Sequence, residues 1–329
     1  MLRTPDPTTP KIMVGWADGT AIHTLENPYL EEYPFFKIFD YNYLSRHNLP
    51  KGTIAFRNRP SEGVEGARLN QLIQGLLVEI KTKKKKYANF SILQNKGFNH
   101  RKACGLLILK FNEYPFVVKL FIETPESFVN PWSKGVEPIF FFYMGGGVNR
   151  HLSGFMRLKN LEYINKKIAS DPRWSSIIET PRKWFWMDSS KDTWLSITGN
   201  NLGDKKIQQT RIPGTYAIIA DAIKAERTFS SLRGKDLQTA LDISNFLEAN
   251  IDLHITNFMV EEGTQKIVLI DTEHFPTMVG DVDKHFDGYL SWYLHLIGKC
   301  GKDMFFSTKA ERRSAQYAHA DSAQPRAKA

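Results

Sequence analysis

The chain has 329 residues, of which 42% are hydrophobic, 24% charged and 12% aromatic. These proportions are typical of a folded protein with a large core, and they exclude a chain that is disordered throughout. The length suits one two-lobed domain or two modest domains. The formal net charge of +9 is compatible with a nucleotide, a nucleic acid or an anionic lipid surface as partner, but it selects none of them.

Cysteine usage and hydropathy exclude further classes. Two cysteines, Cys104 and Cys300, are too few for a disulfide framework or a four-cysteine metal site. The first residues carry prolines and acids where a signal peptide needs an apolar segment. No apolar stretch approaches the roughly 20 residues of a membrane-spanning helix. We therefore expect a cytoplasmic protein with no membrane span.

Residues 1–60 are rich in prolines and aromatic residues and contain several turn signals. This composition predicts an irregular N-terminal arm that packs Phe35, Phe36 and Phe39 against the rest of the protein. Residues 61–89 are expected to form a helix and a basic linker, because apolar residues recur at three- and four-residue spacing over 64–81.

Six residues of the linker, 81–86, read KTKKKK. A run of this kind is usually a solvated helix end or loop. It also offers a weak contact to an anionic surface such as a lipid membrane.

The pattern changes at Phe90, where apolar runs bounded by turn residues predict antiparallel strands. A helix is expected over 152–168, and its apolar residues fall on more than one face, so it is either buried or broken. The strands expected before and after it are 90–93, 105–111, 115–122, 139–144, 184–187, 194–198 and 216–223.

The last folded region is expected to begin with an amphipathic helix over 235–249. A loop over 250–257 and two short strands, 258–260 and 266–270, follow it. A final core helix is expected over 284–298. The stretch 309–329 has almost no apolar content, which predicts a flexible tail.

Carboxylate and amide side chains lie on the two loops that flank the hairpin expected from strands 258–260 and 266–270. Asp252 and Asn257 lie five residues apart in the first loop, and Asp271 follows the second strand. Phosphoryl transfer needs Mg²⁺ held against the phosphates and a carboxylate that accepts the proton of the attacking hydroxyl. Because Mg²⁺ prefers oxygen ligands, the pattern indicates a phosphotransfer site.

The segment resembles the catalytic and metal-binding loops of the protein-kinase-like superfamily, in which an Asp is followed five residues later by an Asn. Its Asp-Leu-His and Ile-Asp-Thr-Glu sequences are nearest in style to aminoglycoside phosphotransferases and lipopolysaccharide kinases. The resemblance implies an α+β, two-lobed protein-kinase-like fold. An antiparallel β N-lobe with insertions would occupy 90–223, and a short helical C-lobe would occupy 224–308. Residues 216–223 resemble the last N-lobe strand and the hinge that meets adenine.

The resemblance also implies a role for each candidate residue. Asp252 is the catalytic residue that orients and deprotonates the acceptor hydroxyl, and Asn257 and Asp271 hold Mg²⁺. Lys119 contacts the α- and β-phosphates of ATP. Gly97 belongs to the loop that covers those phosphates.

The glutamate that pairs with Lys119 is expected to be Glu162 on the helix 152–168, with Glu126 and Glu137 as alternatives. His254 is expected to have a structural role in its loop. Glu273 is expected either to support the Asp271 loop or to hold a second metal ion.

These roles predict an ATP- and Mg²⁺-dependent phosphotransferase that moves the γ-phosphate to a hydroxyl acceptor. A small molecule or a glycan is favoured over a protein, because no Ala-Pro-Glu segment follows Asp271. The alternative is a pseudokinase that acts as a nucleotide- or protein-binding module. Its support is that Asn250 stands where the family usually has His, and that loop 95–105 lacks the three-glycine pattern. Nucleic-acid binding is disfavoured, because it rests only on the basic surplus.

Overall fold

The structure, a computed structural model, describes residues 11–26, 37–130, 147–200, 207–248, 251–252, 254–274 and 294. Within these residues the chain is α+β, with antiparallel sheets and several helices. The first elements are β1 (Lys11–Trp16), β2 (His23–Glu26), α1 (Tyr41–Leu44), η2 (Ser45–His47), β3 (Thr53–Phe56), β4 (Arg59–Glu65), α2 (Gly66–Lys81), β5 (Phe90–Gln94), β6 (Phe98–Asn99), β7 (Cys104–Phe111), β8 (Phe116–Ile122) and α3 (Pro125–Val129).

The later elements begin with a long helix and end in a short hairpin. They are α5 (Gly147–Ala169), α6 (Pro172–Ile177), β9 (Ile178–Glu179), β10 (Lys183–Met187), η4 (Lys191–Thr193), β11 (Trp194–Asn200), β12 (Gln208–Pro213), β13 (Thr215–Asp221), β14 (Ala225–Thr228), α7 (Gly234–Phe246), η5 (Ile255–Asn257), β15 (Phe258–Glu261) and β16 (Ile267–Leu269).

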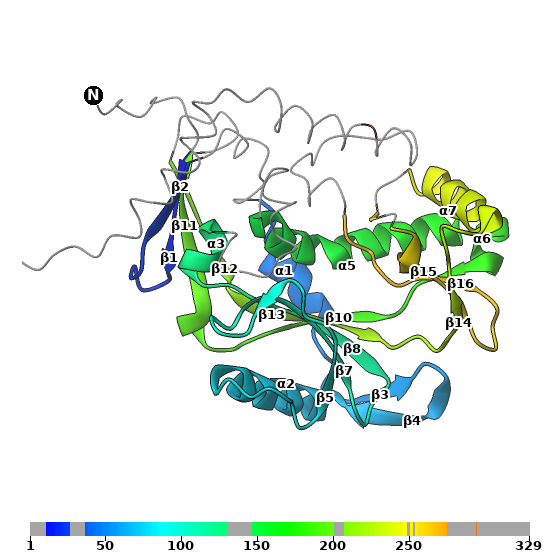
Figure 1. Cartoon of the computed structure of the whole chain (residues 1–329), viewed down its shortest axis with the longest axis horizontal. Helices are drawn as coiled ribbons and strands as arrows, with labels where there is room; N and C mark the ends of the chain where they lie inside the picture. The colour runs from blue at the N-terminus through cyan, green and yellow to red at the C-terminus, as the bar shows by residue number, and fades with distance from the viewer. Residues whose placement is uncertain are drawn as a thin grey trace, which may run out of the picture.

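A six-stranded sheet lies between α2 and α5 (Figure 1). Its main path runs β10-β13-β8-β7-β5, and β6 pairs with β7. Side chains alternate along β8, so Phe116, Val118 and Leu120 pack with α2, while Phe121 packs with α5. Lys119 shares the Phe121 side of the strand and therefore points toward α5.

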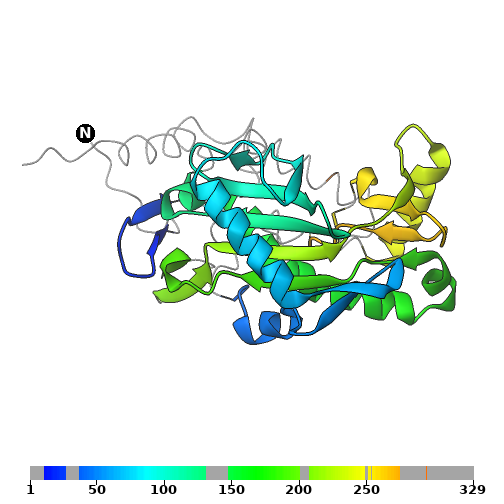
Figure 2. The same ribbon diagram turned by 90° about the horizontal axis from the view of Figure 1, so that it is seen from below.

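Helix α2 crosses the strands of this sheet (Figure 2). Its apolar side chains Leu69, Ile73 and Leu76 are buried against the sheet, which confirms the helix predicted from their spacing. It ends at Lys81, so the rest of the basic run lies beyond the helix.

The described part of the N-terminal arm contains regular strands, which corrects the expectation of an irregular arm over residues 1–60. Strands β1 and β2 join β11 and β12 in a four-stranded sheet of order β12-β11-β1-β2. Ile12 and Val14 are fully buried, because the alternating KIMVGW sequence turns one side of β1 toward the core. The predicted packing of Phe39 is confirmed: its ring contacts Phe155 and Trp194, with centroids 4.9 and 5.7 Å apart. Phe35 and Phe36 lie outside the described residues.

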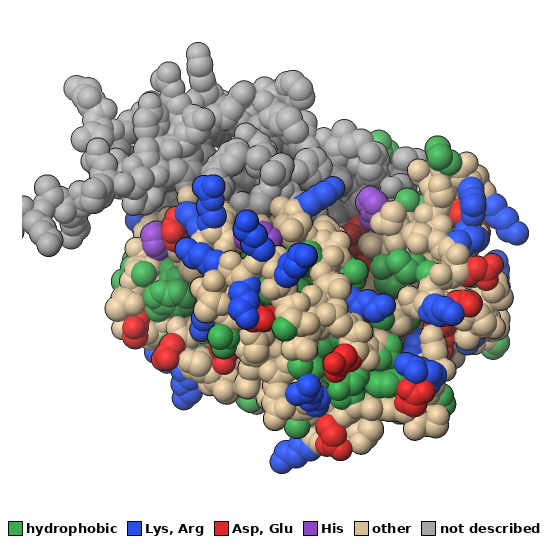
Figure 3. All heavy atoms as spheres, turned by 60° about the horizontal axis from the view of Figure 1, so that its bottom comes forward, with side chains coloured by type: hydrophobic (Ala, Val, Ile, Leu, Met, Phe, Trp, Pro, Cys, Tyr) green, Lys and Arg blue, Asp and Glu red, His purple; other side chains and the backbone are tan. Residues whose placement is uncertain are grey.

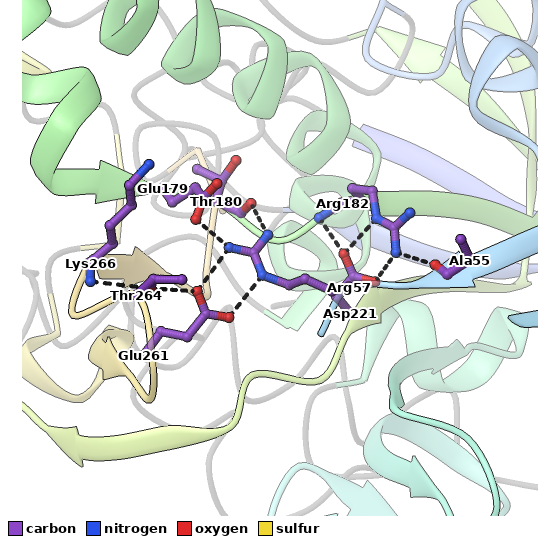
Figure 4. Close-up of polar contacts among 9 residues, drawn as sticks. All are labelled: Ala55, Arg57, Glu179, Thr180, Arg182, Asp221, Glu261, Thr264 and Lys266. Atoms are coloured by element: carbon purple, nitrogen blue, oxygen red, sulfur yellow. Dashed lines mark hydrogen bonds and ion pairs between the residues drawn. The ribbon is translucent and has the colours of Figure 1, made fainter. Parts of the chain in front are cut away.

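A hairpin of β3 and β4 occupies residues 53–65, where the arm and the start of the helical linker were expected. Arg57, at its turn, lies between Glu261 of β15 and Glu179 of β9 (Figure 4). Its Nε donates to Glu261 Oε1 at 2.9 Å and its Nη2 to Glu179 Oε2 at 2.5 Å. Beside it, Arg182 forms an ion pair with Asp221 at 2.8 Å. The ion pairs of Arg57 connect the hairpin to another four-stranded sheet, of order β14-β15-β16-β9.

Helix α5 is continuous and contributes to two cores. Leu152, Phe155 and Leu158 pack in the core that contains β1 and β11. Ile164 and Ile168 pack with α6, α7 and the β15–β16 hairpin. Because the two cores contact different sides of the helix, its apolar residues fall on more than one face.

Several predicted segments lie outside the described residues. They are the strand 139–144, the C-terminal helix 284–298 apart from residue 294, the tail 309–329, Glu137, Asn250 and Cys300. The other cysteine, Cys104, is buried. None of the described helices has the length and apolar character needed to cross a membrane.

Candidate functional site

The loop that follows α7 is fastened to the segment that follows β16. Asp252 N donates to the carbonyl oxygen of Glu273 at 3.2 Å. Asn257 Nδ2 donates to the carbonyl oxygen of Asp252 at 3.0 Å, and Ile270 N donates to the carbonyl oxygen of Asn257 at 3.0 Å. The Asn257 side chain therefore braces the loop that carries Asp252. His254 helps in the same way, because its backbone N–H donates to Asp252 Oδ1 at 3.2 Å.

Three carboxylates meet where these segments join. One oxygen each from Asp252, Asp271 and Glu273 lies within 4.8 Å of the others. The structure thus brings together the two predicted aspartates and adds Glu273. Oxygen donors of this kind suit Mg²⁺, which is commonly held by one or two carboxylates plus phosphate oxygens. The donor set therefore fits the predicted metal ion.

Lys119 reaches this group from the six-stranded sheet. Its Nζ lies 2.6 Å from Asp271 Oδ2, although 152 positions separate the two residues in the sequence. The lysine side chain is largely buried, with 19% of it exposed. The predicted phosphate-contacting lysine and the predicted metal-binding aspartate are thus direct neighbours.

The structure does not place Glu162 beside Lys119. Glu162 Oε1 lies 3.1 Å from His47 Nε2, and 56% of its side chain is exposed. The alternative Glu126 forms an ion pair with Lys102 at 2.6 Å. Another residue of α5, Arg157, does reach the site, as described below. Glu162 lies five residues after it, which corresponds to about 140° of rotation around the helix, so Glu162 faces a different direction.

Arg157 is the main residue that the sequence interpretation missed. It lies on α5 with 2% of its side chain exposed. Nη1 forms an ion pair with Asp271 Oδ1, and Nη2 lies 2.7 Å from Glu273 Oε2. One signal for it exists in the sequence: the arginine stands among apolar residues of α5, between Phe155 and Leu158.

Further buried side chains hold the segment 271–273. Lys183 Nζ donates to Thr272 Oγ1 at 2.7 Å, and Thr272 Oγ1 donates to the carbonyl oxygen of Arg157 at 2.9 Å. Ser153 Oγ donates to Glu273 Oε1. Two helix residues and one residue of β10 therefore fix the loop that follows β16.

The two aspartates have pKa values shifted in opposite directions. Burial raises the pKa of Asp252 to about 6, and the charges of Asp271 and Glu273 add to this effect. Burial would also raise the pKa of Asp271, but Arg157, Lys119 and Lys183 hold it well below its usual range. Opposite shifts within one site are a common property of acid–base centres. Asp252 is thus suited to take up a proton near neutral pH, and Asp271 stays ionised.

Burial also acts on the lysines of the site. It lowers the pKa of Lys119, although the charges of Asp271 and Glu273 oppose it. It lowers the pKa of Lys183 further, with Asp271 again opposing. Both shifts have the direction expected when an ammonium group leaves water.

Gly97 lies in the loop between β5 and β7, as predicted. Its carbonyl oxygen accepts a hydrogen bond from Leu106 N at 2.9 Å. Gly105 faces it with φ +110°, and a Cβ atom there would lie 2.1 Å from the Gly97 oxygen. The base of this loop is therefore closed by a tight backbone contact that only glycine permits at position 105.

No protein-family model, curated protein or solved structure matches this chain. The chemistry of the site is therefore inferred from its own residues: three carboxylates, one amide and three buried cationic side chains.

Proposed function

We propose that the chain is a divergent kinase-like phosphotransferase that moves the γ-phosphate of ATP to a hydroxyl acceptor. The observation that carries the proposal is the ion pair between Lys119 and Asp271 beside Asp252. These residues come from three separate elements and follow the order of the kinase-like pattern. A small molecule or glycan is the favoured acceptor.

The fold supports the same proposal. Residues 90–223 would form the N-lobe around the six-stranded sheet, and residues 224–308 would form the C-lobe around α7 and the β15–β16 hairpin. Strand β13 of the six-stranded sheet ends at Asp221, and β14 of the β14-β15-β16-β9 sheet begins at Ala225. Residues 222–224 therefore link the two sheets, where a hinge that meets adenine would lie.

Each side chain has a role in this reaction. Asp252 orients the acceptor hydroxyl and takes its proton, for which a pKa of about 6 is suitable. Asp271 and Asn257 would hold Mg²⁺, with Glu273 as a further oxygen donor. When bound, Mg²⁺ neutralises charge on the phosphates. Lys119 would bind the α- and β-phosphates.

A pseudokinase is the second candidate, and one observation favours it. Both oxygens of Asp271 already accept from cationic side chains, Arg157 and Lys119. A binding module that never takes a metal would be stable in this arrangement. Nucleic-acid binding gains no support from the face in Figure 3, where Lys and Arg side chains are interspersed with acidic ones and form no single patch.

Thermal unfolding with ATP and Mg²⁺ tests the proposal. A ligand at about 100 times its dissociation constant adds about 2.7 kcal/mol to the native state. We expect wild-type protein to gain stability only when both are present, and Asp271→Asn to lose that gain. Asp242→Asn, a partly exposed position on α7, is the control and should keep the gain.

The stability gained from ligand is compared within each variant, because Asp271→Asn also removes the charged partner of Lys119 and one of the two charged partners of Arg157. Wild-type protein that gains nothing at millimolar ATP and Mg²⁺ would contradict the nucleotide site. A gain without any ATP hydrolysis or phosphate transfer would favour the pseudokinase.

A further inference from the structure

Asp271 is the most heavily neutralised carboxylate of the site. Its Oδ2 lies 2.6 Å from Lys119 Nζ, and its Oδ1 accepts from Arg157 Nη1 and from the backbone N–H of Glu273. The arginine is 98% buried, so water cannot replace it. Each oxygen of Asp271 that a metal ion could take as ligand is thus already in contact with a cationic group, and Oδ1 is in contact with the guanidinium group.

Glu273 is also fully engaged. Its Oε2 lies 2.7 Å from Arg157 Nη2, and its Oε1 accepts from Ser153 Oγ. The guanidinium group of Arg157 therefore bridges two of the three carboxylates with its two terminal nitrogens. Among the described side chains, no lysine or arginine forms an ion pair with Asp252, so the positive charge of Arg157, Lys119 and Lys183 acts mainly on Asp271 and Glu273.

A divalent ion and this guanidinium group exclude each other at Asp271. Mg²⁺ binds carboxylate oxygens at about 2.0–2.1 Å and demands near-octahedral geometry. An ion at that distance from Oδ1 would overlap the position of Arg157 Nη1 or face it as a neighbouring positive charge. In a buried site such repulsion is weakly screened.

We propose that Arg157 is the resident counter-ion of the metal site and that a divalent ion binds by displacing it from Asp271. The inference rests on the proposed function. Arg157 keeps its contact with Glu273 during the exchange, so only the Nη1 end of the side chain moves. Arg157 thereby sets the affinity of the site for a divalent ion.

Metal titration without nucleotide tests the inference. Free Mn²⁺ is followed by electron paramagnetic resonance in wild-type protein, Arg157→Met and Lys167→Met. We expect Arg157→Met to bind Mn²⁺ at least tenfold more tightly than wild type, because the competing charge is gone. Lys167→Met removes the same charge from the same helix about 15 Å away and should bind as wild type does.

Equal or weaker Mn²⁺ binding by Arg157→Met overturns the inference, because the arginine would then not compete with the metal. Since that variant removes one ion-pair partner from both Asp271 and Glu273, a second measurement uses the wild type. Arginine-selective ¹⁵N labelling resolves guanidinium N–H signals, and Arg157→Lys assigns them. Saturating Mg²⁺ should alter the Nη1 signals of Arg157, and unchanged signals contradict displacement.

The outcomes separate this inference from the proposed function. Stabilisation by ATP and Mg²⁺ that depends on Asp271, together with unchanged Mn²⁺ affinity in Arg157→Met, removes the inference alone. If neither the wild type nor Arg157→Met binds a divalent ion, both the metal site and the inference are wrong.

Discussion

Asp252 and Asp271 have the same side chain, but their surroundings shift its pKa in opposite directions. Asp271 lies among Arg157, Lys119 and Lys183, which keep its pKa below the usual range. Asp252 has the same low-dielectric surroundings without a cationic partner among the described lysines and arginines, and its pKa rises to about 6. The difference in partners thus favours Asp271 as metal ligand and Asp252 as proton acceptor.

The raised pKa of Asp252 predicts a pH-dependent effect of Asp252→Asn on stability. Because the folded-state pKa lies above the ordinary value of 3.8, the ionised side chain costs stability as pH rises from about 4 to about 6. Removing the charge should therefore stabilise the metal-free protein by about 3 kcal/mol at pH 8, since one pKa unit corresponds to about 1.4 kcal/mol.

Urea unfolding in EDTA at pH 8 and pH 4 measures this difference. Near pH 4 the wild-type side chain is protonated in the folded state, so the advantage of Asp252→Asn should shrink toward zero. An equal effect at both pH values would show that the change acts through packing rather than through the charge.

At the scale of the element, α5 is fitted closely to the sheet. A Cβ atom on Gly154 would lie 1.9 Å from Tyr216 Oη, whose hydroxyl donates to the carbonyl oxygen of His151. The glycine therefore lets the helix approach β13, and the approach brings Ser153 and Arg157 to the segment 271–273.

Two alanine substitutions at helical glycines should have opposite effects. Gly154→Ala should destabilise the protein by about 1–3 kcal/mol or more, because the methyl group overlaps Tyr216. Gly75→Ala on α2, where nothing lies within 4 Å of the added Cβ atom, should stabilise it by about 0.5–1 kcal/mol through helix propensity. Chemical denaturation measures both, and a neutral Gly154→Ala would contradict the close packing.

At the scale of the molecule, Arg57 connects the β3–β4 hairpin to the sheet that contains the β15–β16 hairpin. Its partner Glu261 has only 1% of its side chain exposed, and the arginine lowers the pKa of that carboxyl against the effect of burial. The second partner, Glu179, belongs to β9 of the same sheet. The contact therefore joins residues more than 200 positions apart.

Arg57→Met should destabilise the protein by about 3 kcal/mol, because it leaves the buried Glu261 unpaired. Arg59→Met is a matched control on the same hairpin. Its partner Glu62 is half exposed, so its loss should cost less than about 1 kcal/mol. Thermal or urea unfolding compares the two, and equal effects would show that Arg57 stabilises the fold only through surface contacts.

Local sequence patterns were sufficient for the main strands of the six-stranded sheet and for the helix that covers it. The helix α2 and the strands β5, β7, β8, β10, β11 and β13 lie where apolar spacing predicted them. The N-terminal strands were missed, because prolines and turn signals surround the short alternating sequence 11–16. Its identity as a strand becomes clear only from its pairing with the distant strand β11. Such pairing depends on residues far away in the chain, which local patterns do not report.

The site was predictable where one loop carries a motif. The spacing of Asp252, Asn257 and Asp271 led to residues that the structure places together or, for Asn257, against the Asp252 backbone. Arg157 was not predictable, because its role depends on which side of α5 meets the segment 271–273. The choice of Glu162 followed from its position on the helix, but rotation of the helix turns it toward His47.

The pairing of β1 with β11 also has a consequence for synthesis on the ribosome. Val14 pairs with Ile197, so one edge of β1 waits for a partner that is made about 180 residues later. At about 5–20 residues per second, this delay is about 10 to 40 seconds. During that time β2 is the only one of the two strands paired with β1 that has been made, and the core that later buries Ile12 and Val14 is incomplete. The nascent β1 segment therefore needs protection from aggregation until β11 has been made.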